Sequence, residues 1–99
     1  MAYLFDASGH KIAKIGDDER VRNMAGVSIG KVAFNGDVYN GMGEKVGTVE
    51  ENGDIYQEGK KIGTVKNNGD VFDYEGRRVG KVAGGNVKLG GAALLLLAR

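Results

Sequence analysis

The sequence predicts an all-β protein built from short successive antiparallel hairpins that curl around a pseudo-symmetry axis. Three observations support this: a repeat of about 17 residues, Asn-Gly pairs between extended apolar runs, and β-branched or aromatic residues at the repeated apolar positions. Such residues suit a half-buried pleated surface. Internal repetition has to be recognised first, because it decides the architecture.

Each repeat is centred on a small residue between aliphatic ones. These anchors follow one another at steps of 17, 17, 16 and 17 residues. They are Ala13, Gly30, Gly47, Gly63 and Gly80. The repeat units span residues 3–19, 20–37, 38–54, 55–70 and 71–86, and we expect residues 1–99 to form a single domain.

Two kinds of turn alternate along the chain. One opens with Asp or Asn and closes with glycine three residues later, as in Asp73–Gly76, which is typical of a type I turn ending in a left-handed glycine. It is one residue shorter at residues 57–59, which accounts for the single 16-residue step. The other is Asn-Gly, for which we predict a type I′ turn with positive φ at both residues. The Asn-Gly turns end in Gly36, Gly53 and Gly69, and Asp18-Glu19 is the poor match in the first unit.

The second strand of each unit has apolar residues three apart, such as Val46 and Val49. A regular strand would place these on opposite faces, so either both faces are partly buried or the intervening glycine marks a β-bulge or a sharp coil. We favour the coil, and we expect the hairpins to curl into a closed ring or barrel. The anchor glycines Gly30, Gly47, Gly63 and Gly80 are therefore interpreted as structural.

The apolar tail, residues 90–99, contains four consecutive leucines, Leu94, Leu95, Leu96 and Leu97. It has high helix propensity and is apolar all round, which is typical of a buried segment. It is shorter than the ~20 residues that span a bilayer, so a membrane role is expected only if the natural chain extends beyond Arg99. A plug inside the ring and a contact in a homo-oligomer are both open, and either would enclose all four leucines.

Composition excludes several functions. There is no cysteine, which rules out disulfides and cysteine metal sites and leaves the redox compartment open. The 14 basic and 13 acidic residues nearly cancel, so charge gives no specific nucleic-acid signal. The N-terminus has no signal-peptide pattern, which predicts a cytoplasmic protein.

Candidate chemistry is sparse, and we expect no catalytic residue, no metal site and no cofactor. His10 has no nucleophile placed near it by sequence and is interpreted as a turn residue. Two sets of charges recur in register and could form an axial carboxylate ring or an anion-binding ring, but turn residues and solvated strand positions explain them. They are Asp37, Asp54 and Asp70, and Lys11, Lys45, Lys61 and Arg78.

The aromatic residues give an alternative function. Tyr39, Tyr56 and Phe72 occupy equivalent places and could bind a sugar, nucleobase or anion by stacking at the mouth of the ring. The hypothesis we prefer is a non-enzymatic structural or interaction module that contacts itself or another protein. A deep aromatic pocket would favour ligand binding, and a filled axis would favour the module.

The aligned glycines and Asn-Gly-Asp turns of residues 3–89 carry a resemblance. Their motif, apolar-Gly-x-apolar-x-x-Asn-Gly-Asp-apolar-aromatic, resembles that of the four-fold beta flower family of small bacterial proteins. The resemblance implies hairpin petals around an axis and no established activity. A weaker likeness, over Gly59–Tyr74, is to MORN-type and choline-binding hairpin repeats, whose longer units and tryptophans are absent here.

Overall fold

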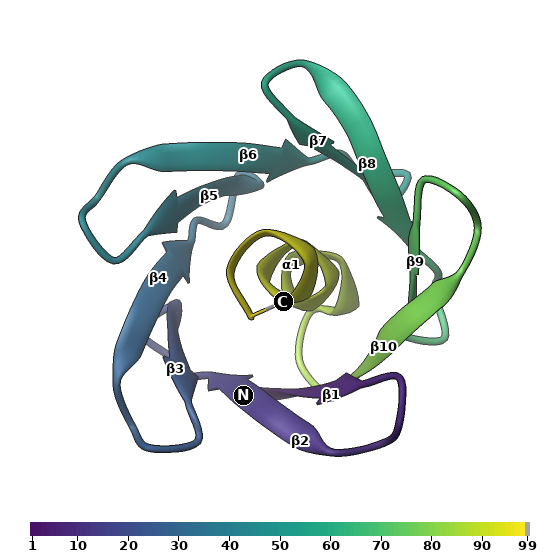
Figure 1. The fold of residues 1–99 in the computed structure, drawn as a ribbon. Helices are drawn as coiled ribbons and strands as arrows, with labels where there is room; N and C mark the ends of the chain where they lie inside the picture. The colour runs from purple at the N-terminus through teal and green to yellow at the C-terminus, as the bar shows by residue number, and fades with distance from the viewer. Residues whose placement is uncertain (99) are drawn as a thin grey trace.

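Ten short antiparallel strands close into one barrel around a C-terminal helix (Figure 1). The structure, a computed structural model, describes residues 1–98. β1 pairs with both β2 and β10, so the barrel has no free edge. The elements are β1 (Ala2–Asp6), β2 (Lys11–Ile15), β3 (Arg20–Asn23), β4 (Ser28–Val32), β5 (Asp37–Asn40), β6 (Lys45–Val49), β7 (Asp54–Gln57), β8 (Lys60–Val65), β9 (Asp70–Asp73), β10 (Arg78–Ala83), α1 (Val87–Ala93) and the π-helix η1 (Leu94–Ala98). The predicted fold class is confirmed.

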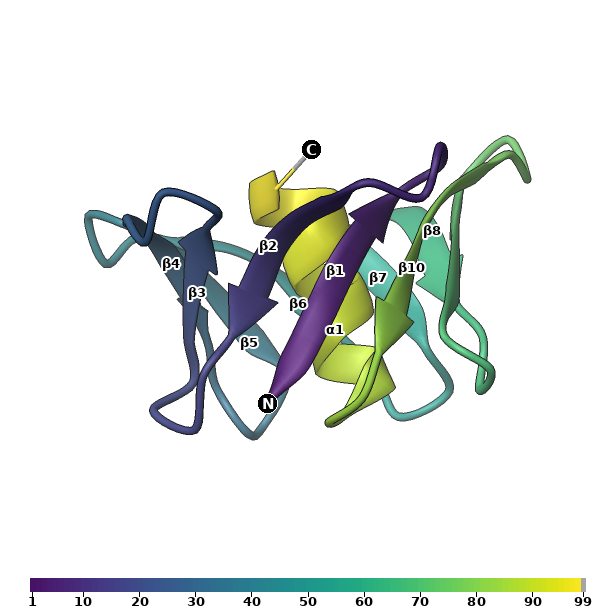
Figure 2. The same cartoon turned by 90° about the horizontal axis from the view of Figure 1, so that it is seen from below.

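Five hairpins form the petals of the barrel, and their tips gather at the end where the helix finishes (Figure 2). At four tips an Asp or Asn side chain accepts two backbone N–H groups. Asp73 Oδ1, for example, accepts from Glu75 N and Arg77 N, both at 3.0 Å. The glycine that closes each tip has positive φ, as Gly76 has at 83°. The prediction of a type I turn ending in a left-handed glycine is confirmed.

The type I′ prediction for the Asn-Gly turns is wrong. In the turn of Gly36, the glycine donates to Ala33 O and Ala33 donates to Asp37 O, so the loop has three residues rather than two. Only the glycine has positive φ (98°), and Asn35 does not. This is a type I turn followed by a bulged glycine. The Asn35 side chain favours it, because its Oδ1 accepts from Asp37 N at 3.0 Å.

A two-residue loop occurs where the Asn-Gly motif is absent. In the fourth hairpin Gln57 pairs directly with Lys60, and the two residues between them both have positive φ, 52° at Glu58 and 80° at Gly59. This is the conformation of a type I′ turn. Glu19, with φ 69°, takes the place of the bulged glycine in the first unit.

Each hairpin carries a β-bulge. The sharp coil that we favoured for the second strand of each unit is therefore wrong, and the alternative, a β-bulge, is confirmed. In the fourth hairpin Ile55 pairs with Gly63 and Tyr56 pairs with Lys61, which leaves Ile62 as the extra residue. The anchor glycines Gly30, Gly47, Gly63 and Gly80 have no positive φ. Because the bulge resets the alternation, both Ile62 and Val65 reach the core despite their spacing of three.

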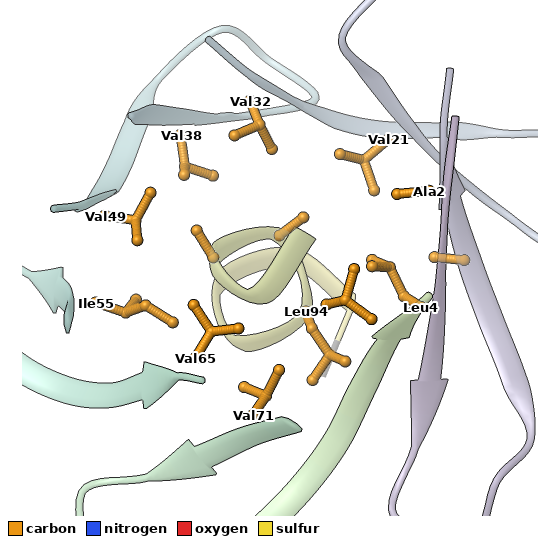
Figure 3. Close-up of a cluster of buried hydrophobic side chains, with 14 residues drawn as sticks. Ala2, Leu4, Val21, Val32, Val38, Val49, Ile55, Val65, Val71 and Leu94 are labelled. Carbon is orange, nitrogen blue, oxygen red and sulfur yellow. The ribbon is translucent and has the colours of Figure 1, made fainter. Parts of the chain in front are cut away.

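The core is a ring of side chains around the plug (Figure 3). One fully buried residue comes from the first strand of each hairpin: Leu4, Val21, Val38, Ile55 and Val71. The helix runs through the middle, with Asn86 Oδ1 accepting from Lys88 N and Leu89 N at its start. Of the two predicted roles for the tail, the plug is confirmed. Arg99 lies outside the described residues.

Candidate functional site

Each leucine of the plug faces the anchor glycine of a different hairpin. A Cβ built on any of these glycines would collide with the Cδ1 of its leucine. The pairs and distances are Leu94–Gly80 (2.8 Å), Leu95–Gly63 (2.6 Å), Leu96–Gly47 (2.7 Å) and Leu97–Gly30 (2.6 Å). The leucines therefore fill the space that the glycines leave.

The size relationship between helix and strands is reversed in the preceding part of the helix. Gly90 and Gly91 of α1 face Val82 and Val65, and a Cβ on either glycine would lie 2.5 Å from its valine. Small helix residues thus meet large strand residues there, while large helix residues meet glycines above. The ring and the plug are matched in size at both levels.

The π-helix explains how consecutive leucines reach successive hairpins. Hairpins in a ring of five stand one fifth of a turn apart, whereas an α-helix advances about 100° per residue, more than a quarter of a turn. A π-helix, with its i→i+5 bonding, turns less per residue, so the step in η1 comes closer to that of the ring. If the order continues, we expect Ala98 to lie opposite Ala13, the anchor that is not glycine.

The leucines are not all enclosed, which corrects the sequence-based expectation. Leu94 is fully buried, but the next three leucines are partly exposed because they lie where the barrel opens. Around them stand the five aliphatic residues that form the bulges. We call this apolar surface the mouth: Ile12, Ile29, Val46, Ile62, Val79, Leu95, Leu96, Leu97 and Ala98.

Exposed apolar side chains also lie on the hairpin tips at this end of the barrel. They are Met24 (55% exposed), Val27, Met42 (86%) and Tyr74 (75%). At the opposite end of the barrel, in the loop between β4 and β5, Phe34 is 83% exposed.

The aromatic candidates do not gather at the mouth. Tyr39, Tyr56 and Phe72 follow the buried Val38, Ile55 and Val71, and strand alternation turns them to the outside of the barrel. Tyr56 and Phe72 line separate grooves between neighbouring hairpins. A single aromatic site at the ring mouth is therefore wrong.

The two recurring sets of charges neutralise each other on the outer surface. Aspartate and cation of the same hairpin pair in three units: Lys45–Asp37 (3.3 Å), Lys61–Asp54 (3.1 Å) and Arg78–Asp70 (3.2 Å). In the first hairpin Tyr3 replaces the aspartate, and Lys11 Nζ lies 4.3 Å from its ring centroid. No group of three or more acidic or histidine side chains within residues 1–98 could hold a metal ion.

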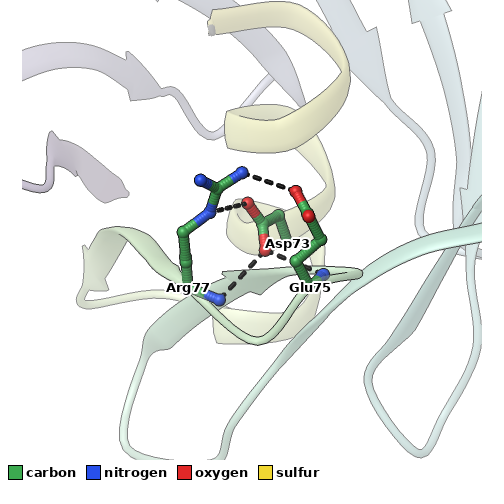
Figure 4. A network of polar contacts seen from close by, with 3 residues as sticks. All are labelled: Asp73, Glu75 and Arg77. Atoms are coloured by element: carbon green, nitrogen blue, oxygen red, sulfur yellow. Dashed lines mark hydrogen bonds and ion pairs between the residues drawn. The ribbon is translucent and has the colours of Figure 1, made fainter.

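Asp73 is the one buried charged residue of the described core (Figure 4). Its Oδ2 also accepts from Arg77 Nε at 3.4 Å, and Arg77 in turn pairs with Glu75. The backbone N–H of Arg77, above all, holds the pKa of the Asp73 carboxyl below its usual value. The carboxylate is engaged in its own turn, so it is structural.

His10 is exposed at a tip, with Nδ1 3.6 Å from Asp6 Oδ2. Asp6 Oδ1 accepts from Ser8 N and His10 N at 2.9 Å. Asp6 and His10 therefore belong to a tip turn of the same kind as the Asp73 turn of the fifth hairpin.

No family model, curated protein or solved structure matches the chain. Between residues 1 and 98, the helical segment is too short for a membrane-spanning helix.

Proposed function

We propose that this protein is a non-enzymatic interaction module whose contact surface is the mouth, and that its partner is a second copy of the chain. The observation that carries the proposal is that the partly exposed leucines and the hairpin tips that carry exposed Met24, Met42 and Tyr74 lie at the same end of the barrel. Apolar patches of this kind mark interaction surfaces.

Charge favours contact between two mouths. The tip segments, residues 6–11, 23–28, 40–45, 57–61 and 73–78, carry five acidic and six basic side chains. The opposite segments, residues 16–20, 33–37, 50–54, 66–70 and 84–88, carry eight acidic and three basic ones. Two copies would repel through their acidic ends but not through their mouths. A two-fold contact of like surfaces is also the commonest form of self-association.

We propose a relation to the four-fold beta flower proteins on the basis of the sequence motif, and the arrangement of hairpins around an axis is compatible with it. This chain closes its ring with five hairpins, unlike the four-fold arrangement in the family's name.

Sedimentation velocity over a range of concentrations tests the proposal. The wild-type chain should shift from monomer to dimer, and Met24→Ser/Met42→Ser/Tyr74→Ser should stay monomeric. Phe34→Ser is the matched control, because it removes an equally exposed apolar side chain at the acidic end. A wild-type chain that is monomeric throughout, or a triple variant that still dimerises, would contradict it.

A further inference from the structure

The outer surface between the fourth and fifth hairpins carries a groove of about 380 Å³. Thr64 on β8 lies opposite Phe72 on β9 in its middle. Lys66 stands towards one end, and Lys61 and Tyr74 stand towards the other. The groove therefore combines two aromatic rings with two cations.

One of these cations is free to bind a ligand. Lys61 is already paired with Asp54. Lys66, in contrast, makes no ion pair with any residue from 1 to 98, and its Nζ lies 6.0 Å from the Phe72 ring centroid. The carboxylate in the lining, Asp73, is occupied by backbone N–H groups and Arg77.

The repeat supplies a natural control, because the groove between the third and fourth hairpins has the same frame. Lys45, Thr48 and Tyr56 there take the places of Lys61, Thr64 and Phe72. However, Glu50 takes the place of Lys66, and the turn contributes Glu58 in place of Tyr74. The two grooves thus share equivalent lining positions but differ in charge and in aromatic surface.

We infer that the groove between the fourth and fifth hairpins binds a small planar anion, an aromatic ring that carries a carboxylate or phosphate. The ring stacks on Phe72, with Tyr74 beside it, and the anionic group reaches Lys66. The related groove excludes the same ligand, because Glu50 would repel it. Tyr74 also belongs to the surface proposed for self-association, but Lys66 and Phe72 do not, so variants at these two residues test the groove separately.

A ¹⁵N–¹H NMR titration with benzoate and with AMP tests the inference, and inorganic phosphate and adenosine are the comparators. Benzoate or AMP should give saturable shifts at the amides of Gly63, Thr64 and Gly76, and not at Gly47 and Thr48. Lys66→Glu should weaken binding about ten- to hundredfold, the effect of losing a charge-assisted hydrogen bond. Phe72→Leu should weaken it about tenfold by removing the stacking surface, and each variant's own spectrum reports its folding.

The related groove provides a test by gain of function. Glu50→Lys should add saturable shifts at Gly47 and Thr48 while those at Gly63 persist. Shifts that do not saturate, or an unchanged affinity in Lys66→Glu, would overturn the inference. If phosphate bound as tightly as AMP, the groove would recognise charge alone. If adenosine bound as tightly as AMP, stacking alone would be sufficient. Either result would also overturn it.

Discussion

Leu96 fills the space next to Gly47 that any side chain on that glycine would need. A Cβ on Gly47 would lie 2.7 Å from Leu96 Cδ1 and would also collide with the backbone oxygen of Tyr56. The leucine end could move, but the carbonyl belongs to a paired strand and could not move far. Gly47 is therefore required by packing and not by a special backbone angle.

Gly47→Ala should lower the free energy of unfolding by about 1–3 kcal/mol, the usual effect of overpacking a core. Denaturant titration would measure it. Gly41→Ala is the control, because Gly41 lacks positive φ and a Cβ there would meet nothing closer than 3.7 Å. Equal stability of both variants would show that the plug does not press on the ring.

The order of the leucines predicts that Ala98 and Ala13 form the fifth pair of the set. Ala98→Leu alone should destabilise the barrel, because the methyl group of Ala13 occupies the space. Ala13→Gly alone should leave a void, and the double variant should recover stability. We expect a coupling of about 0.5–3 kcal/mol in a double-mutant cycle. Strict additivity would show that the two residues do not meet.

Glu19→Gly should stabilise the protein by about 0.5–1 kcal/mol. Glu19 occupies the bulged-glycine position with φ 69°, which is unfavourable for a residue with a side chain. Its ion pair with Lys31, at 4.0 Å on the surface, contributes little. Thermal unfolding would show a higher midpoint. Gly53→Ala, the reverse change in an equivalent turn, should lower it, because a Cβ there would strike the oxygen of Val65.

Asp73→Ala should destabilise the fifth hairpin by about 1–3 kcal/mol, since it leaves the amides of Glu75 and Arg77 without their acceptor. Asp73→Asn should be milder, because Asn23 and Asn40 accept the same two bonds in other hairpins. Urea titrations of both variants would distinguish a hydrogen-bonding role from a purely charged one. A larger loss in Asp73→Asn than in Asp73→Ala would refute the turn role.

Stability should fall in acid. The folded pKa of Asp73 is lowered chiefly by the Arg77 amide, and that of Asp18 is lowered to about 2 by its hydrogen bond with the Arg22 side chain. Groups with depressed folded pKa values stabilise above the unfolded pKa, about 3.9, and this contribution is lost as pH falls through the folded pKa. Unfolding free energies measured from pH 6 to pH 2 should therefore decrease below about pH 4. In Asp73→Asn the decrease should be smaller.

Deleting residues 94–99 should unfold the barrel. Leu94 is fully buried, and burial of one leucine contributes about 1.5–3 kcal/mol, a large share of the 5–15 kcal/mol typical of a domain. Circular dichroism with thermal melting would check it. A truncated chain with an unchanged melting temperature would show that the ring stands without this part of its plug.

The sequence alone determined the repeat, the all-β class, the curled hairpins and the helical tail, because spacing, turn chemistry and propensity are local properties. The roles of the glycines at the tips and of the Asx residues before them can be predicted directly from the sequence, since each acts on backbone groups only a few residues away. The type of the turn at Asn35-Gly36 could not be predicted in the same way. Its loop length depends on which residues pair across the strands.

Only the tertiary structure decided what the tail meets and what the aromatics face. Four adjacent leucines look identical in sequence, yet each packs against the glycine of a different hairpin, 14 to 67 residues away along the chain. Whether the bulge turns Ile62 towards the core, and Phe72 outwards towards Lys66, follows from strand register. Such relationships arise only when the barrel closes, because closure brings distant repeats to the same axis and fixes which faces become interior.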